Sequence, residues 1–209
     1  MITIPSPSLV EGDIDSEFFL AARKQGSVAW DIETTGLDWR HDRIGTVQLA
    51  LPSGETAVVQ IKPGQTPENL VTLLEIPALR KIFHFAPFDL SFMVHAWRAR
   101  PLNIVCTKVL AKIVSPGATS YSLQDLLRAE LGVRIAKDQI RTSDWSTPKL
   151  SDDQIAYAVE DVRHLHELFE ALMAKALIAG VAGLAERSFE YLPIRVLTDL
   201  RGSGDIFAY

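Results

Sequence analysis

The sequence contains a single cysteine among its 209 residues, and this scarcity limits the kinds of fold and site that it can build. One thiol, Cys106, cannot form an intramolecular disulfide and cannot supply the several ligands of a multi-cysteine zinc site. Cys106 lies in the apolar run I104-V-C, where a cysteine behaves as a small hydrophobic side chain. We therefore expect neither a disulfide framework nor a zinc centre built from cysteines.

Long apolar runs and a surplus of basic residues are also missing. No segment approaches the ~18 consecutive apolar residues of a membrane span, and M-I-T-I-P-S-P-S lacks the basic and apolar regions of a signal peptide. We therefore expect a soluble cytoplasmic protein. The formal net charge of −5 argues against a broad basic surface that grips long nucleic acid. A nucleic-acid substrate stays compatible with this charge, because bound metal ions can supply positive charge locally.

The length of the chain and its composition, with 47% hydrophobic and 22% charged residues, favour one globular domain spanning 1–209. Apolar runs bounded by turn residues predict three strands joined by short turns, in the segments that begin at Val28, Ile44 and Thr56. Two shorter strands are expected at 81–85 and 104–106. The sequence thus predicts an α/β domain with a mixed five-stranded sheet, whose first strands are antiparallel and whose faces are covered by helices.

Helices are expected in the segment after Pro67, over 87–97, and near 107–114 and 122–131. Ser122 with Gly132 fits the start and end of the last of these, and S151-D-D-Q predicts a capping box at the start of a final long helix. Its buried stripe would comprise Ile155, Val159, Val162, Phe169 and Leu172. The apolar segment from about 192 to 209 is expected to pack on the body of the domain or on another subunit.

Two carboxylates, Asp31 and Glu33, lie two residues apart in the predicted strand V28-A-W-D-I-E-T-T-G-L. Side chains at i and i+2 of a strand leave the same face of the sheet, so these two stand side by side. Holding two like charges together costs free energy, which a bound cation would offset.

Two further acids stand where the hydrophobic pattern does not predict them: Asp89 interrupts an almost wholly apolar run, and Asp161 lies at the border of the buried stripe of a predicted helix. Taken alone, Asp89 is typical of the first turn of a helix, and Asp161, one helical turn after Tyr157, is typical of an exposed helix face. Together with the strand pair, however, they could converge at one edge of the sheet. Four carboxylates in one cleft need cations, and Mg²⁺ or Mn²⁺ match oxygen ligands. Two such ions ~3.5–4 Å apart would stabilise both the attacking oxygen and the leaving oxygen of a phosphoryl transfer.

Several residues beside these acids could contact a substrate. Thr34, Thr35 and Leu37 follow the strand pair directly, in T-T-G-L, and Phe88 precedes Asp89. Leu37 and Phe88 could pack on a terminal base, because apolar and aromatic contacts accept any base. Phe88 could equally belong to the core.

One histidine and a group of basic residues leave two interpretations open. His84 could face the cleft, or it could be a hydrogen-bonded structural residue of its apolar strand. The basic residues that precede the Tyr157 helix could bind phosphates or lie in a solvated loop; they are Arg134, Lys137, Arg141 and Lys149.

The order of these motifs resembles a known enzyme family. Asp31-x-Glu33, H84-F-A-P-F-D and Tyr157-x-x-x-Asp161 are similar to the three motifs of the DEDDy branch of the DEDD 3′→5′ exonucleases, which have an RNase H-like fold. T142-S-D-W followed by L150-S-D-D-Q resembles ribonuclease D, which carries additional helical domains. The short length and F189-E-Y-L-P-I-R resemble the nanoRNase C type, compact enzymes that degrade very short RNA as ring-like homo-oligomers.

The resemblance implies roles for the acidic residues and the tyrosine. Asp31, Glu33 and Asp161 would bind one metal ion, while Asp31 and Asp89 would hold a second. Tyr157 would orient the attacking water, because a phenol with a pKa of ~10 is a poor base at neutral pH. The product would be a nucleoside 5′-monophosphate. Thr35 departs from the pattern, since a bulkier apolar residue that wedges between bases is expected there in dinucleotide-specialised enzymes.

The resemblance favours a metal-dependent 3′→5′ exoribonuclease that acts on short single-stranded RNA. The alternatives are an exonuclease for DNA or for longer RNA such as tRNA 3′ ends, and a catalytically silent nucleic-acid-binding module on the same fold. A silent relative typically lacks a metal ligand, whereas this chain has all four acids and the tyrosine. A catalytic core over about 28–175 and a packing or oligomerisation segment over about 185–209 complete the expected organisation.

Overall fold

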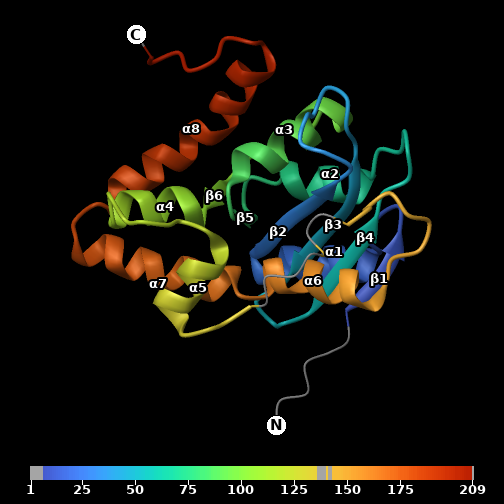
Figure 1. Cartoon of the computed structure of the whole chain (residues 1–209), viewed down its shortest axis with the longest axis horizontal. Helices are drawn as coiled ribbons and strands as arrows, with labels where there is room; N and C mark the ends of the chain where they lie inside the picture. The colour runs from blue at the N-terminus through green and yellow to red at the C-terminus, as the bar shows by residue number, and fades with distance from the viewer. Residues whose placement is uncertain (1–6, 136–139, 141–142, 209) are drawn as a thin grey trace.

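The computed structural model describes residues 7–135, 140 and 143–208 and contains one mixed sheet flanked by helices (Figure 1). The order of the six strands across the sheet is β1-β4-β3-β2-β5-β6. The strands are β1 (Ser8–Glu11), β2 (Ser27–Thr34), β3 (Ile44–Ala50), β4 (Thr56–Gln60), β5 (Arg80–Phe83) and β6 (Ile104–Cys106). Strands β2, β3 and β4 form the expected antiparallel meander, whereas β1 pairs parallel with β4 and β5 pairs parallel with β2 and β6.

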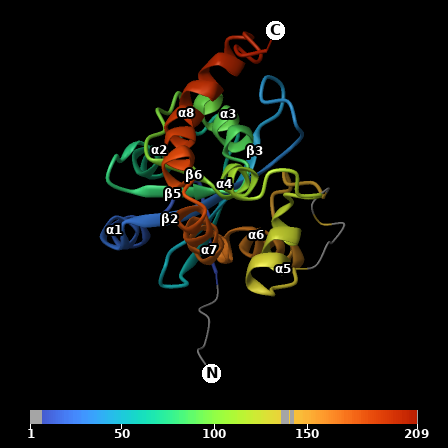
Figure 2. The same ribbon diagram turned by 90° about the vertical axis from the view of Figure 1, so that its left-hand side faces the viewer.

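The helices lie on both sides of this sheet. They are α1 (Ser16–Gln25), α2 (Glu68–Glu75), α3 (Ala86–Trp97), α4 (Thr107–Val114), α5 (Leu123–Leu131), α6 (Asp152–Arg163), α7 (Leu165–Ile178) and α8 (Ala182–Leu200). Helix α6 crosses β2, β3 and β4, whereas α7 packs mainly on α4 and α5. Figure 2 shows α8 on the near side of the molecule, where it lies against α3, α4 and β6.

The two helix starts expected from capping signals are confirmed. Ser151 and Gln154 form a reciprocal capping box at the start of α6, and the Ser122 hydroxyl accepts from the backbone N–H of Asp125 at the start of α5. Gly132 ends α5 in the left-handed conformation, with φ 69°. These caps depend on interactions within a few residues, which is why the local sequence is sufficient to predict them.

The structure differs from the sequence prediction in the last predicted helix and in the sheet. The expected long helix from Ser151 is divided at His164, because its first half packs on the sheet and its second half on α4 and α5. Ile155 is only partly buried, so it does not belong to the fully buried stripe. The sheet has six strands rather than five, because the short, mostly exposed segment Ser8–Glu11 pairs with β4. Its four residues show too little alternation to signal a strand.

The apolar side chains form two clusters of unequal size. The main cluster joins both faces of the sheet to most of the helices and includes the fully buried Trp30. The smaller cluster lies between α6 and the sheet and consists of Val58, Trp145, Leu150, Ala158 and Val159. Within the described part of the chain, no helix combines the length and apolar character that a bilayer crossing requires.

Lys81 on β5 is fully buried, and its ammonium group donates a hydrogen bond of 2.7 Å to the carbonyl of Ile76 at the end of α2. Burial lowers the pKa of Lys81 from 10.5 to about 7. Between these two values the unfolded chain binds more protons than the folded chain. The free energy of unfolding should therefore rise with pH over this window.

We expect Lys81→Met to be more stable than the native protein at pH 6, by about 1–3 kcal/mol, because no charge is then buried. This advantage should shrink towards pH 10, where the native lysine is neutral in the fold. Urea denaturation of both proteins across this pH range measures the difference. An advantage of the variant that grows with pH would contradict the assignment.

Candidate active site

A cavity of about 530 Å³ opens beside the end of β2, between α3 and α6. Asp31 and Glu33 reach it from β2, Asp89 from the first turn of α3, and Tyr157 and Asp161 from α6. These elements are far apart in sequence and meet because β2 is central in the sheet, with α6 packed across it. The fold thus brings all four acids and the tyrosine into one cavity.

Asp31, Glu33 and Asp161 form the most closely spaced part of the site. One carboxylate oxygen from each lies within 4.8 Å of the others. Burial, followed by the negative charge of Asp161, raises the pKa of Asp31 well above its ordinary value. Three carboxylates with no sulfur or nitrogen donor suit a hard divalent cation, whose charge would offset their repulsion. These residues could therefore hold a metal ion.

Asp89 lies next to this group but is held differently. Its side chain is 2% exposed, and Oδ1 accepts a hydrogen bond of 3.1 Å from the backbone N–H of Ile32. Burial and the charges of Asp31 and Asp161 raise its pKa well above the ordinary value. The pKa of Asp89 thus depends on the charges of the other acids, and its hydrogen bond to Ile32 connects α3 to β2. Asp89 nevertheless lies outside the three-carboxylate group.

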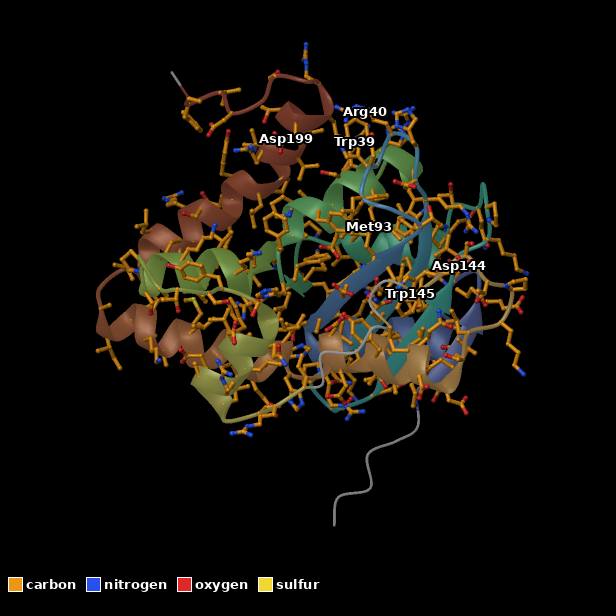
Figure 3. All side chains as sticks on the ribbon, in the orientation of Figure 1. Trp39, Arg40, Met93, Asp144, Trp145 and Asp199 are labelled. Carbon is orange, nitrogen blue, oxygen red and sulfur yellow. The ribbon has the colours of Figure 1, made fainter. Side chains whose placement is uncertain are left out.

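Tyr157 is positioned by the segment that precedes α6. Its ring packs against Trp145, with the ring centroids 6.1 Å apart, and Trp145 lies between the sheet and α6 (Figure 3). Gly45 on β3 permits this approach, because a Cβ there would overlap the Trp145 carbonyl oxygen. Burial and the charges of Asp161, Glu33 and Asp31 raise the pKa of Tyr157, so its phenol stays protonated.

The residues expected to contact a substrate all line the same cavity: Thr34, Thr35, Leu37, His84 and Phe88. Leu37 is 83% exposed, so its side chain is available to a ligand. The threonine hydroxyls, in contrast, shape the turn after β2. Thr34 donates to the carbonyl of Gly36, and Thr35 accepts from the backbone N–H of Arg43.

His84 lines the cavity and also forms a hydrogen bond within the protein. Its Nδ1 lies 2.9 Å from the hydroxyl of Thr107, which donates to the carbonyl of Phe83. Burial and the nearby charge of Lys108 lower the pKa of His84 to about 4. The imidazole is therefore neutral at physiological pH, and its hydrogen bond to Thr107 supports the structural interpretation.

Among the basic residues weighed as phosphate ligands, Lys137 and Arg141 lie outside the described residues. Arg134 and Lys149 are described, but neither lines the cavity.

Sequence reasoning missed three residues of this site: Phe85 and Ser143, which line the cavity, and Gln48, which lies behind Asp31. Gln48 is directly opposite Asp31 in the register of β2 and β3. Its Nε2 donates to Asp31 Oδ2 at 2.8 Å, while its Oε1 accepts from Thr46 at 3.1 Å. A polar residue inside the buried run I44-G-T-V-Q-L-A was the available signal, but its partner becomes visible only through strand register.

We expect Gln48→Met to weaken metal binding about 10-fold to 100-fold, because a residue that orients a metal ligand typically has an effect of this size. Titration of Mn²⁺ by calorimetry measures the change. Gln25→Met removes an amide that bonds to Ser53, away from the cavity, and serves as the control. An unchanged affinity in Gln48→Met would show that Asp31 needs no orienting group.

Comparison with known proteins relates this geometry to a family. A family model described as 3′–5′ exonuclease matches residues 12–176. A solved structure described as the apo form of a nuclease is 38% identical, with a TM-score of 0.93 and coverage of 98% of this chain and 99% of that one. NrnC from Brucella melitensis is 35% identical, with a TM-score of 0.92 and coverage of 98% of both chains.

Ribonuclease D proteins differ more from this chain than the two structures above, because they are longer or less similar in sequence. The protein from Gluconacetobacter diazotrophicus is 33% identical over 129 residues, which are 62% of this chain and 32% of that protein. The chain thus spans about a third of the length of such curated relatives. RNase D from Escherichia coli, 20% identical with a TM-score of 0.79 over 92% of this chain and 51% of that one, shares the RNase H-like fold. Because the family model covers most of the sequence and solved relatives match nearly end to end, the chain belongs to the 3′–5′ exonuclease family.

Proposed function

We propose that this exonuclease hydrolyses short single-stranded RNA from the 3′ end and releases nucleoside 5′-monophosphates with the help of two divalent metal ions. The observation that carries the proposal is the three-carboxylate group of Asp31, Glu33 and Asp161 in one cavity with Asp89 and Tyr157. Structures of Brucella melitensis NrnC with bound Mg²⁺ and with bound pGG support it, since they match 98% of this chain at 34% and 35% identity.

The four acids and the tyrosine of the cavity each have a part in this reaction. Asp31, Glu33 and Asp161 would hold one ion, and Asp31 with Asp89 a second, either Mg²⁺ or Mn²⁺. When bound, the ions supply a water of lowered pKa and stabilise the charge that develops on the phosphate. The protonated phenol of Tyr157 orients the attacking water, whose oxygen bonds to phosphorus as the bond to the 3′ oxygen breaks.

The remaining residues of the cavity would bind the 3′-terminal nucleotide. Leu37 and Phe88 pack on its base, and Thr34 and Thr35 shape the turn that approaches it. His84 supports the wall of the cavity beside Phe88. Thr35 is too small to wedge deeply between two bases, so a substrate longer than a dinucleotide is compatible with the turn.

Hydrolysis of DNA or of longer RNA such as tRNA 3′ ends is the second candidate. The longer-RNA form of this candidate is supported by the Escherichia coli RNase D structure, which is described as an exoribonuclease involved in structured RNA processing. A catalytically silent nucleic-acid-binding module is a weaker candidate, because the cavity holds four acids and the tyrosine together.

The test is incubation of the purified chain with 3′-labelled and 5′-labelled RNAs and DNAs from two to about twenty nucleotides, with Mn²⁺, Mg²⁺ or chelator. We expect nucleoside 5′-monophosphates to leave from the 3′ end, fastest for the shortest RNAs, and no cleavage with chelator. Faster cleavage of DNA or of long RNA would support the second candidate. Binding without cleavage under every metal condition would contradict both.

We further propose that residues 28–175 form the catalytic core and that 185–209 mediate a homo-oligomer. Helix α8 buries Phe189 and Val196 against the body of the domain but leaves Leu197 53% exposed, and Phe207, which follows the helix, is 77% exposed. Deletion of 202–209 combined with Leu197→Glu should convert a large assembly into monomers in solution scattering. A monomeric full-length chain would refute the assembly.

A further inference from the structure

Phe85, which directly precedes α3, has an unusual conformation and an unusual environment. Its φ of 75° lies in the left-handed region, which is unfavourable for a bulky side chain. The residue is nevertheless 44% exposed. Its backbone N–H donates to the buried thiol of Cys106 and its carbonyl accepts from Phe88, so this conformation is fixed from both sides. The fold thus holds an aromatic ring at the surface at some cost.

The ring lies where two cavities meet. Phe85 lines the cavity that holds the four acids, and it also lines a second cavity of about 580 Å³ between the start of α3, α4 and α8. Pro87, Val109 and Leu192 contribute the apolar wall of this second cavity. A chain that leaves the catalytic cavity on this side must pass the Phe85 ring.

A positive charge accompanies the ring. Lys108, in the first turn of α4, places its ammonium nitrogen 4.4 Å from the centroid of Phe85. Within the described residues Lys108 forms no ion pair, whereas Arg187 and Arg195 across the second cavity are paired with Glu190 and Asp199. Lys108 is therefore a cation beside the catalytic cavity that remains available to an anionic ligand.

An exposed aromatic ring next to such a cation is the combination by which proteins bind single-stranded nucleic acid, with the ring stacking on a base and the cation near the backbone. In a 3′→5′ exonuclease the terminal nucleotide occupies the acidic cavity, so the next nucleotide must lie at an exit from it. We propose that Phe85 and Lys108 form the subsite for the nucleotide on the 5′ side of the scissile bond, with Phe85 stacked on its base and Lys108 at its 5′-phosphate. This subsite rests on the proposed hydrolysis of short strands.

The test compares two substrates in the full chain: a 5′-phosphorylated dinucleotide, and the same molecule with an abasic ribose at the 5′ position. Phe85→Gly removes the ring without backbone strain, because glycine adopts left-handed φ freely. We expect this variant to raise KM for the dinucleotide about 5-fold to 100-fold, with a smaller change in kcat. KM for the abasic substrate should stay the same as in the native enzyme, and Phe85→Trp should retain binding of the dinucleotide.

Lys108→Gln should raise KM for the 5′-phosphorylated dinucleotide and not for its 5′-hydroxyl form, and Lys108→Arg should restore the native value. Phe19→Ala is the matched control, because Phe19 also lies under a cation, Arg23, but on α1 and outside both cavities. Equal losses on both substrates, or a drop in kcat and melting temperature alone, would overturn the subsite. A native enzyme that cleaves neither substrate would contradict the proposed function instead, and affinities for the two dinucleotides in Ca²⁺ would then decide the subsite.

Discussion

Asp31→Asn is expected to reduce hydrolysis by on the order of 10³-fold or more while making the metal-free protein more stable. Asp31 is the acid shared by both proposed metal positions, so its loss removes a charged ligand from each. An amide oxygen is a weaker ligand for a hard cation and cannot replace this charge. The rate of release of nucleoside 5′-monophosphates, measured across Mn²⁺ concentrations, gives the size of the loss.

The gain in stability follows from the same carboxylate. Burial and the charge of Asp161 raise the pKa of Asp31 in the fold above that of the unfolded chain. The folded chain therefore holds this proton more tightly, and the free energy of unfolding falls as pH rises through the raised pKa. Asparagine removes this dependence. We therefore expect Asp31→Asn to have a higher free energy of unfolding than the native protein at pH 7 in chelator.

Thermal denaturation in chelator and in Mn²⁺ tests both effects together. The native protein should gain melting temperature from Mn²⁺, and Asp31→Asn should gain little. Glu170→Gln, which neutralises an exposed acid on α7, is the control for net charge and should change neither response. An active Asp31→Asn, or one that is less stable than the native chain in chelator, would contradict the proposed role of this residue.

Tyr157→Phe is expected to lower kcat by about 10²–10⁴-fold, the range typical of a group that acts on a proton or on water in the transition state. Metal affinity should stay unchanged, because the three-carboxylate group does not include the phenol. The ring should still pack against Trp145, so the position of α6 is kept.

The pH dependence separates a positioning hydroxyl from a base. The surrounding acids and burial raise the pKa of Tyr157, so no phenolate forms near neutral pH and the pH profile of kcat should show no step due to this group. Tyr191→Phe is a suitable control, because the Tyr191 hydroxyl has no hydrogen-bond partner among the described residues. Native activity in Tyr157→Phe would remove its proposed role.

The features that the sequence predicts correctly depend on short distances along the chain. Asp31 and Glu33 share a face because they are two residues apart in a strand, and the Ser151 capping box needs only Gln154. The four acids could be grouped before the structure was known because their motifs resemble those of a family in order and spacing. Composition alone gave no indication of this grouping.

The features that the sequence misses depend on contacts between distant segments. The break at His164 reflects two different packing surfaces, and the parallel pairing of β1 needs the edge of β4. Gln48 becomes part of the site only through its register opposite Asp31. Phe85 has an ordinary sequence environment, and its left-handed backbone is a result of tertiary structure.

The small apolar cluster beneath α6 has a consequence for the cooperativity of the fold. Helix α6, which carries Tyr157 and Asp161, is seated largely on this cluster, whereas β2 and α3 belong to the main one. If α6 and its small cluster opened locally, Asp161 and Tyr157 would therefore leave the active site together while the sheet stays intact. An ion held jointly by β2 and α6 would couple the two units, so amide hydrogen exchange in α6 would become as slow as in the central strands.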